Sequence, residues 1–274
     1  MPTIVDQQST VDLLRHEFAA IRSLCAVLTA EQWATPTCLP GWTVHDVLGH
    51  VIGTEAMLTG EETPSADISH LDHMANAIAE SNEVWVESVR SLSGEEMLAR
   101  FDQVTGARLK ALDAMDQADF DAPSWTPAGR DETYGRFMRI RHYDCFMHEH
   151  DIRGALGRPS RTDPADLASA LDEVETGLGY IVGRRAAMPE GSRIRLDLVG
   201  PFSRTFRVAV VDGRASVVGS LDGEPTVVVE MPATLFLRLT GGRDDGIRPA
   251  DAGLAVSGDL DLGTRLVDNL AFTI

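Results

Sequence analysis

The spacing of apolar residues divides the chain into two parts. From Val11 to about Arg185, apolar residues recur three and four positions apart, which is the period of amphipathic helices. This pattern predicts helices that begin near residues 11 and 43, then helices over about 70–92, 95–115, 134–156 and 164–185. A turn-rich segment, DAPSWTPAGRDETYG at 121–135, lies before the helix at 134–156. The first part of the chain is therefore expected to be all-helical.

After MPEGS at 188–192 the period changes to the alternation of β-strands. Short strands are expected around 194–198, 206–210, 217–218 and 227–229, with the turn signals GPFS, DGR and DGEP between them. Two short helices are expected at about 232–239 and 261–270, separated by a GGRDDG turn at 241–246 and a strand around 254–256. The sequence thus predicts a helical domain at 1–187 and a smaller α+β domain with an antiparallel sheet at 188–274.

Polar residues interrupt the buried stripe of the helix at 134–156. Steps of helical spacing from Ile140 lead to Asp144, His148 and Asp151, where leucine or valine would be expected. Asp144 and His148 are four residues apart, so both project from one face of the helix. A carboxylate and an imidazole at that spacing can bind one divalent ion. The alternative is an ordinary hydrogen bond, which explains most such pairs on helices.

A third candidate ligand lies on the helix that begins at Thr43. His50 shares the inner face of this helix with Val47 and Val51. A lone histidine on an apolar face is more often a hydrogen-bonded core residue than a ligand. Two helices that each bury a histidine are harder to explain in that way, because each neutral imidazole needs partners for both ring nitrogens. Together with Asp144 and His148, His50 would form an open three-ligand site with positions left for water or substrate.

The remaining polar residues of these helices are expected to have supporting roles. His45, His142 and His150 fall off the two stripes, so they are expected to face solvent or to support the ligands from outside. Asp151 is expected to orient a ligand. Cys145 is rotated away from the stripe and is expected to be an inert buried thiol.

Composition and charge narrow the classes of function. A content of 43% hydrophobic and 24% charged residues is typical of a globular protein. The net charge of −18 disfavours binding to nucleic acid and to anionic membranes. No apolar run reaches the roughly 18–20 residues that span a bilayer, and the N-terminus lacks the pattern of a secretion signal. With three cysteines and no paired framework, a cytoplasmic location is expected.

Several segments resemble one known family. LPGWTVHDVLGHV (39–51), SWTPAG (124–129) and RHYDCFMHEHDIRGALGRP (141–159) are similar to the maleylpyruvate isomerase branch of the DinB superfamily, the mycothiol-dependent metalloenzymes of actinobacteria. In the second half, GSRIRLDLVGP (191–201), LRLTGGR (237–243) and SGDLDLG (257–263) are similar to the family's C-terminal domain. The resemblance implies a DinB-like four-helix bundle followed by a sterol-carrier-like α+β domain.

The same resemblance implies a site and a chemistry. It places the family's metal ligands on His50, Asp144 and His148, and Asp144 stands where the isomerase itself has glutamate and other branches have histidine. Zinc is the expected ion, with nickel, manganese and iron as alternatives for a mixed imidazole and carboxylate set. Mycothiol is implied as the thiol cosubstrate, attacking a small electrophilic acid in a transfer or a cis–trans isomerisation.

Two further residues are candidates for binding the cosubstrate or the substrate. Arg243 is expected to hold the thiol or a substrate carboxylate, and the alternative is a plain surface arginine. Trp125 is expected to line the site. Trp42 is expected to pack against the helix that follows it, with cofactor stacking as the alternative.

Two other functions stay open on the sequence alone. One is a metal-dependent hydrolase in which metal-bound water attacks the substrate, and the other is a non-catalytic carrier of a small molecule. A hydrolase needs no added thiol, so dependence of the activity on a thiol distinguishes it from a transferase or isomerase. A carrier should keep its ligand binding after the metal is removed, so dependence on metal distinguishes it from the enzymes. The substrate and the oligomeric state are not predicted.

Overall fold

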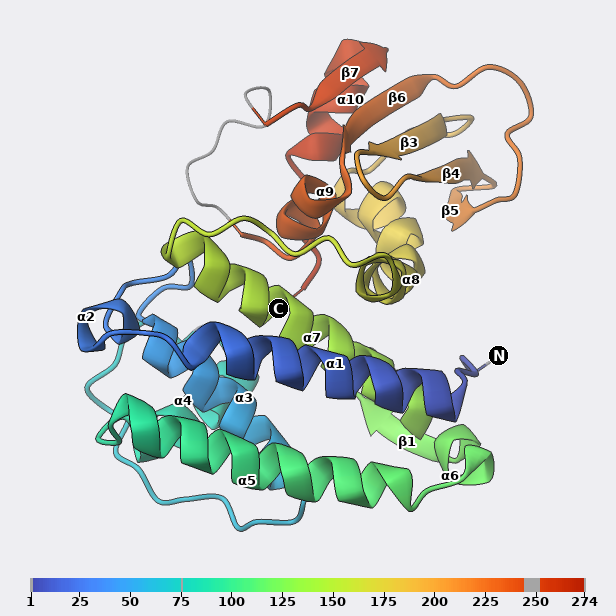
Figure 1. Cartoon of the computed structure of the whole chain (residues 1–274). Helices are drawn as coiled ribbons and strands as arrows, with labels where there is room; N and C mark the ends of the chain where they lie inside the picture. The colour runs from blue at the N-terminus through green and yellow to red at the C-terminus, as the bar shows by residue number, and fades with distance from the viewer. Residues whose placement is uncertain (1, 75, 244–251, 274) are drawn as a thin grey trace. The chain divides into compact units, whose positions relative to one another are not determined.

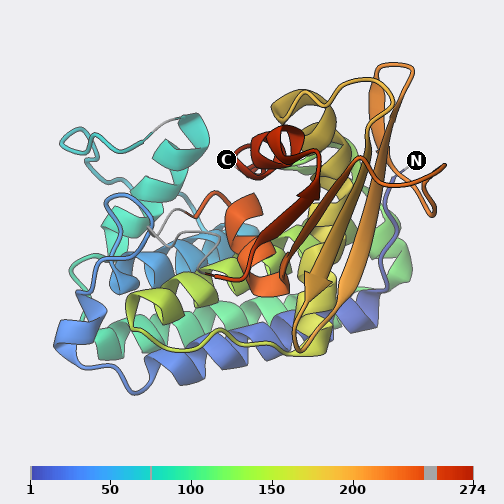
Figure 2. The same cartoon turned by 90° about the horizontal axis from the view of Figure 1, so that it is seen from above.

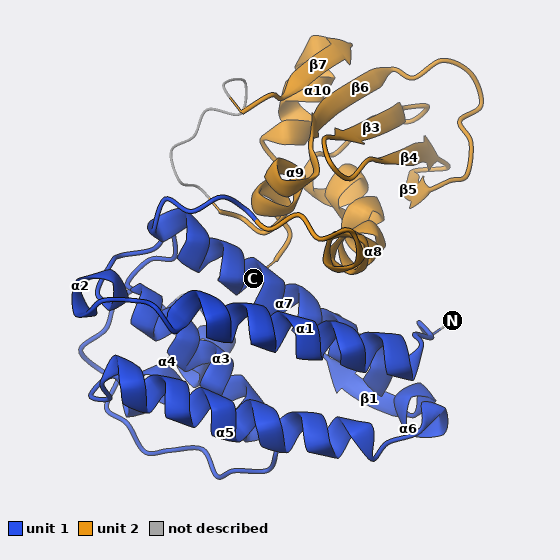
Figure 3. Ribbon diagram, in the orientation of Figure 1, with its two compact units in different colours: residues 1–160 blue, residues 161–274 orange. Residues whose placement is uncertain are grey.

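The computed structural model describes residues 2–74, 76–243 and 252–273. The chain forms two compact units, Met1–Ser160 and Arg161–Ile274 (Figure 3). The first is helical apart from a short hairpin, and the second combines helices with a five-stranded sheet (Figure 1). The fold class predicted from the sequence, a helical region followed by an α+β region, is confirmed.

Four long helices form the bundle of the first unit (Figure 1). They are α1 (Gln7–Cys25), α3 (Val44–Leu58), α5 (Gly94–Asp113) and α7 (Tyr134–Ala155). Helices α1 and α3 each pack against both α5 and α7, so the four helices close around one core. The shorter elements of this unit are α2 (Ala30–Trp33), α4 (Ala77–Val89), α6 (Gln117–Asp121), β1 (Pro123–Thr126) and β2 (Gly129–Thr133).

Local hydrogen bonds and apolar burial determine how the bundle helices are placed. Thr43 and Asp46 form a reciprocal capping box that begins α3, and Thr133 caps α7 by accepting from the amide of Arg136. In the core, the rings of Phe18 on α1 and Phe101 on α5 meet edge to face with centroids 6.1 Å apart. Burial of side chains of this size stabilises the fold by about 1.5–3 kcal/mol each. The core thus fixes the faces that α3 and α7 turn toward each other.

Helix α4 approaches α3 very closely at one glycine. A Cβ atom built on Gly53 would lie 2.4 Å from the Cβ of Trp85 on α4, and one built on Gly49 would lie 3.0 Å from Val89 Cγ2. Glycine at these positions therefore permits the α3–α4 contact. The α3–α4 contact also places Glu83 of α4, which accepts a hydrogen bond from the Trp42 indole beside the start of α3.

The second unit consists of a mixed sheet with helices against its apolar face (Figure 2). The strand order is β5-β4-β3-β6-β7, and every pair is antiparallel except β3–β6, which is parallel. The strands are β3 (Arg193–Val199), β4 (Arg204–Val211), β5 (Arg214–Val217), β6 (Val227–Pro232) and β7 (Ala255–Gly258). The helical elements are α8 (Pro164–Tyr180), the π-helical turn η1 (Ile181–Arg185), α9 (Ala233–Thr240) and α10 (Leu260–Val267).

The compact units divide at residue 160, whereas the sequence predicted a change of domain after residue 187. The difference concerns α8 and η1, which pack against β5. Gly179 and Gly183 allow this packing, because a Cβ atom on either would lie within about 3 Å of Ala215 on β5. Helical periodicity in the sequence shows that a helix has an apolar face, but not which element that face contacts.

Two predicted elements differ from the structure: the helix expected at 70–92 is the shorter α4, Ala77–Val89, and a predicted loop contains strands. The segment at 121–135, expected to be a loop, contains the hairpin of β1 and β2. The predicted turn at 241–246 lies partly outside the described residues. Within residues 2–74, 76–243 and 252–273, no helix has both the length and the hydrophobicity of a membrane span.

The close approach at Gly53 leads to a stability prediction. Gly53→Ala should lower the free energy of unfolding by about 1–3 kcal/mol, because the new methyl group overpacks against Trp85. Gly106→Ala on α5 is the matched control, since a Cβ atom there meets nothing within 4 Å and should raise stability by up to about 1 kcal/mol. Urea unfolding followed by circular dichroism measures both. A Gly53→Ala variant as stable as the control would contradict the described α3–α4 packing.

Candidate metal centre

Three side chains from two facing helices converge inside the bundle. His50 comes from α3, and Asp144 and His148 come from α7. His50 Nε2 lies 3.4 Å from Asp144 Oδ2, and His148 Nε2 lies 3.5 Å from Asp144 Oδ1. One potential ligand atom from each residue lies within 4.8 Å of the others. The structure therefore brings together the three residues that helical spacing had selected.

The dimensions of this cluster fit a divalent ion. Two ligands bound about 2.0–2.2 Å from a tetrahedral zinc ion lie roughly 3.3–3.5 Å from each other. His50 Nε2 has this separation from Asp144 Oδ2, and His148 Nε2 has it from Asp144 Oδ1, so each imidazole lies at ligand spacing from one of the two carboxylate oxygens. Two imidazoles with one carboxylate also correspond to the three protein ligands of an open catalytic zinc site. The Asp144 side chain is 32% exposed while the two imidazoles are almost fully buried, so an exogenous ligand could reach the cluster beside Asp144.

The two ring nitrogens of His148 both face carboxylates. Nδ1 lies 3.1 Å from Asp151 Oδ2, and Nε2 lies 3.5 Å from Asp144 Oδ1. A neutral imidazole carries one N–H group, so whichever nitrogen donates, the lone pair of the other points at an acceptor. A positive charge is needed to make the second contact favourable. That charge is either a second proton on the ring or a metal ion bound by Nε2.

Burial and neighbouring charges shift the pKa values of all three residues. Burial lowers the pKa of His50, even though its hydrogen bond to Asp144 acts in the opposite direction. Burial also opposes charge on His148, but the carboxylates of Asp144 and Asp151 outweigh it and raise the His148 pKa. The pKa of Asp144 lies well below its usual range, because His148 and Arg141 stabilise the carboxylate against the cost of burial. The cluster therefore offers an ionised carboxylate and, on His50, a neutral nitrogen.

Asp151 supports His148 from the next turn of α7. Its side chain is buried, and its second oxygen accepts from the Cys38 thiol at 3.4 Å. A carboxylate on the far nitrogen of an imidazole fixes the orientation and the tautomer of the ring, which is the usual arrangement around metal-binding histidines. The orienting role predicted for Asp151 agrees with this geometry.

The indole of Trp42 packs against both imidazoles. Its ring centroid lies 5.3 Å from that of His50 and 6.2 Å from that of His148. Trp42 directly precedes the capping residue of α3, so the cap that begins the helix also sets the position of the indole. Trp42 therefore forms one wall of the cluster, beyond the packing role expected from the sequence.

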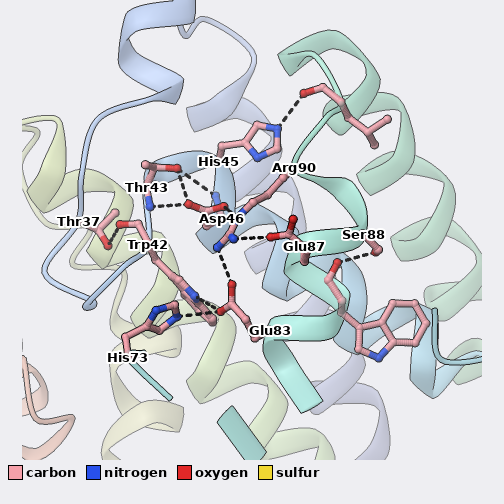
Figure 4. Close-up of polar contacts among 12 residues, drawn as sticks. Thr37, Trp42, Thr43, His45, Asp46, His73, Glu83, Glu87, Ser88 and Arg90 are labelled. Carbon is pink, nitrogen blue, oxygen red and sulfur yellow. Dashed lines mark hydrogen bonds and ion pairs between the residues drawn. The ribbon is translucent and has the colours of Figure 1, made fainter. Parts of the chain in front are cut away.

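A buried carboxylate holds the indole in place (Figure 4). Glu83 on α4 accepts from Trp42 Nε1 at 2.7 Å, from His73 Nε2 at 3.1 Å and from Arg90 Nη2 at 2.5 Å (Figure 4). Arg90 continues the network to the capping residue Asp46, 2.9 Å away. Helix α4 is thus connected to the cluster through Glu83 and Trp42.

Trp125 and Arg243, the two residues predicted to bind cosubstrate or substrate, have the following contacts. Trp125, on β1, is 54% exposed and packs edge to face against Phe137 near the start of α7, with centroids 6.1 Å apart. Arg243 follows α9 in the second unit, and its guanidinium donates to the carbonyl of Gly241. Neither contact tests the predicted roles, which stay predictions.

The histidines off the stripes are more buried than expected. His142 and His150 are 0% and 4% exposed, so of the two expected alternatives they do not face solvent, and support of the ligands from outside stays a prediction. Both imidazoles stack on Phe146, and His150 Nδ1 also donates to the Phe146 carbonyl. His45 is half-buried and donates to the Leu92 carbonyl. The available signal was the aromatic side chain of Phe146, spaced four residues from each of the two histidines.

Cys145 is a buried thiol, as the sequence predicted, and Cys25 is buried as well. Burial raises the pKa of the Cys145 thiol well above its usual range, and it raises that of Cys25 to about 12. Thiols with such pKa values are poor nucleophiles. Neither side chain is therefore suited to act as a nucleophile at this site.

The fold and the cluster define a class of protein: a four-helix bundle with ligand-type side chains projecting inward from facing helices. The model of the mycothiol maleylpyruvate isomerase N-terminal domain matches residues 14–153, a little over half of the chain. The chain belongs to this family.

Similar proteins agree with this assignment. Two relatives from different strains of Mycobacterium tuberculosis, both named as uncharacterized proteins, are each 25% identical over 239 residues, covering 86% of this chain and 90% of the relative. The crystal structure of the mycothiol-dependent maleylpyruvate isomerase matches with a TM-score of 0.59 and 16% identity, covering 92% of this chain and 93% of that one. A histidine-to-alanine mutant of that enzyme matches with a TM-score of 0.58 and 15% identity. At these identities the likeness concerns the fold.

The position of Trp42 leads to a spectroscopic prediction. Titration with Co²⁺, a paramagnetic ion, should quench part of the tryptophan fluorescence, because the Trp42 indole lies against two candidate ligands. Trp42→Phe should abolish the quenching while metal content, measured in parallel, is retained. Trp125→Phe is the matched control and should leave it unchanged. Quenching that survives in Trp42→Phe and disappears in Trp125→Phe would contradict the described geometry.

Proposed function

We propose that this chain is a divalent-metal-dependent enzyme that activates a low-molecular-weight thiol, mycothiol, for transfer to, or cis–trans isomerisation of, a small electrophilic acid. The observation that carries the proposal is the convergence of His50, Asp144 and His148 inside a bundle of the maleylpyruvate isomerase family. The name of the structurally similar enzyme, a mycothiol-dependent maleylpyruvate isomerase, supports the choice of thiol and reaction.

The three ligand residues would hold the ion, and zinc is the proposed one. Bound there, the ion would stabilise the thiolate form of a cosubstrate thiol, whose ordinary pKa of about 8.5 leaves it mostly protonated at neutral pH. His50 and His148 contribute nitrogen lone pairs, and Asp144 contributes one negative charge. Nickel, manganese and iron remain alternatives for this donor set.

The surrounding residues prepare the ligands for this role. Asp151 directs one nitrogen of His148 away from the ligand position and leaves the other for the ion. The Trp42 indole covers the imidazoles and excludes water from that side. Because Glu83 binds the indole nitrogen, the indole is held in one orientation. These contacts keep the site organised before a substrate arrives.

An acidic substrate needs a cationic anchor in a protein of net charge −18. Arg243 is proposed for this role, since a guanidinium can grip a carboxylate with two parallel hydrogen bonds. Trp125 is proposed to contribute apolar surface to substrate binding. The proposed partners are accordingly a small thiol and a small acid, and the proposed location is the cytoplasm, where thiols are kept reduced.

The metal assignment predicts the metal content of variants. Purified wild-type chain should bind about one divalent ion, and His50→Ala and His148→Ala should each lose most of it, because two ligands hold an ion far less tightly than three. His45→Ala, on the same helix as His50 but bonded to the Leu92 carbonyl, is the matched control and should retain it. Elemental analysis measures all four proteins. Equal metal content in His148→Ala and wild type would refute the ligand assignment.

The reaction class predicts dependence on both metal and thiol. Turnover of a maleylpyruvate-type cis acid should require added mycothiol. When the metal is chelated, the turnover rate should fall at least about 100-fold, which is the typical effect of removing a group that stabilises charge in the transition state. Product analysis with and without mycothiol measures this. Metal-dependent turnover without any thiol would indicate a hydrolase instead. Binding of a small molecule that is unaffected by metal removal, with no turnover, would indicate a carrier.

A further inference from the structure

A row of buried charges leads away from the candidate metal centre into the bundle. Arg141 Nη1 donates to Asp144 Oδ2 at 2.6 Å, and Arg141 Nη2 donates to Glu55 Oε1 at 2.8 Å. The second oxygen of Glu55 lies 3.3 Å from Arg108 Nε on α5. Arg108 also donates to the hydroxyl of Tyr134 at 2.7 Å. The charges alternate in sign along the row, and three helices contribute to it.

Arg141 engages one oxygen of Asp144 and not the other. Its guanidinium binds Oδ2, which also lies 3.4 Å from His50 Nε2, whereas Oδ1 faces His148 Nε2 at 3.5 Å. The guanidinium is in turn fixed by a second carboxylate, because both Nε and Nη2 donate to Glu55 Oε1. A carboxylate held in this way has little freedom to rotate. Only one of its oxygens remains without a guanidinium partner.

The burial of Glu55 and Arg141 makes this arrangement specific. Glu55 is 1% exposed and Arg141 is 5% exposed, so neither charge is compensated by water. A buried charge without its partner typically costs several kcal/mol. Arg141 therefore has to keep its contact with Glu55, and this contact determines where its other nitrogen meets Asp144.

We propose that Arg141 is a positioning residue that makes Asp144 a one-oxygen metal ligand, and that Glu55 holds Arg141 in place for this role. This inference rests on the proposed metal-dependent function. A carboxylate limited to one oxygen favours ions of low coordination number with oxygen and nitrogen ligands, such as zinc. A carboxylate free to bind with both oxygens suits larger coordination shells, as around calcium. Arg141 thus acts on metal selectivity without touching the metal.

The test uses the full chain loaded with Co²⁺, whose visible absorption is strong in four-coordinate sites and weak in six-coordinate ones. The double variant Arg141→Met, Glu55→Gln removes one positive and one negative charge, so the net charge of the row is unchanged, and Arg108 keeps its hydrogen bond to the Tyr134 hydroxyl. We expect it to bind Co²⁺ with a several-fold weaker absorption than wild type. We also expect its preference for Zn²⁺ over Mn²⁺, from competition with a chromophoric chelator, to fall about tenfold or more.

Two further variants separate position from charge. Arg141→Lys keeps the positive charge but lacks the fork that contacts both carboxylates, so it should resemble the double variant. Arg22→Met, which removes an exposed ion pair between α1 and Asp102 on α5, is the control and should resemble wild type.

The outcomes distinguish this inference from the function on which it rests. Wild-type absorption and wild-type metal preference in the double variant would overturn the positioning role while leaving the metal site intact. Wild-type behaviour of Arg141→Lys alone would show that charge is sufficient, and this would also overturn the positioning role. Failure of the unmodified chain to bind either Co²⁺ or Zn²⁺ would overturn the proposed function, and the inference with it.

Discussion

His148 is held between two carboxylates, and the rest of the site depends on how this contact is made favourable. Asp151 lies on one side of the imidazole and Asp144 on the other, at 3.1 and 3.5 Å. A neutral ring can donate to only one of them, so a cation is required between the other pair. The two carboxylates raise the His148 pKa against the effect of burial, so they favour a proton at this position when no metal is bound. A divalent ion can replace this proton, because the second imidazole, His50, points at the same carboxylate.

The geometry of this site is built from the packing of the bundle helices. Contact between α3 and α7 brings together residues that are 94 positions apart in the chain. Gly53 and Gly49 let α4 approach α3, and α4 carries Glu83, which binds the indole nitrogen of Trp42. The glycines at the α3–α4 contact thus help to position the Trp42 indole against the imidazoles of α3 and α7. A change in the core can therefore alter the site without replacing any ligand.

The sequence predicted the long helices and the three candidate ligands because both depend on helical periodicity. Asp144 and His148 interrupt an apolar stripe, and such an interruption is visible in one segment read alone. What could not be predicted depends on contacts between segments. Helix α8 packs on β5, and the Trp42 indole lies against the two imidazoles. Glu55 was missed for the same reason, since its role follows from Arg141 on another helix.

Asp144 is a shorter ligand than the glutamate that the resemblance to the isomerase implies at this position in that enzyme. The aspartate side chain is shorter by one methylene. The shorter side chain still reaches both imidazoles, since its two oxygens lie 3.4 and 3.5 Å from His50 and His148. It also lies within 2.6 Å of Arg141, one turn earlier on the same helix. A longer side chain at this position would have to bend to keep all three contacts, and it would lose more side-chain entropy in doing so. The aspartate therefore suits a site whose carboxylate is held by a buried arginine three residues earlier on the same helix.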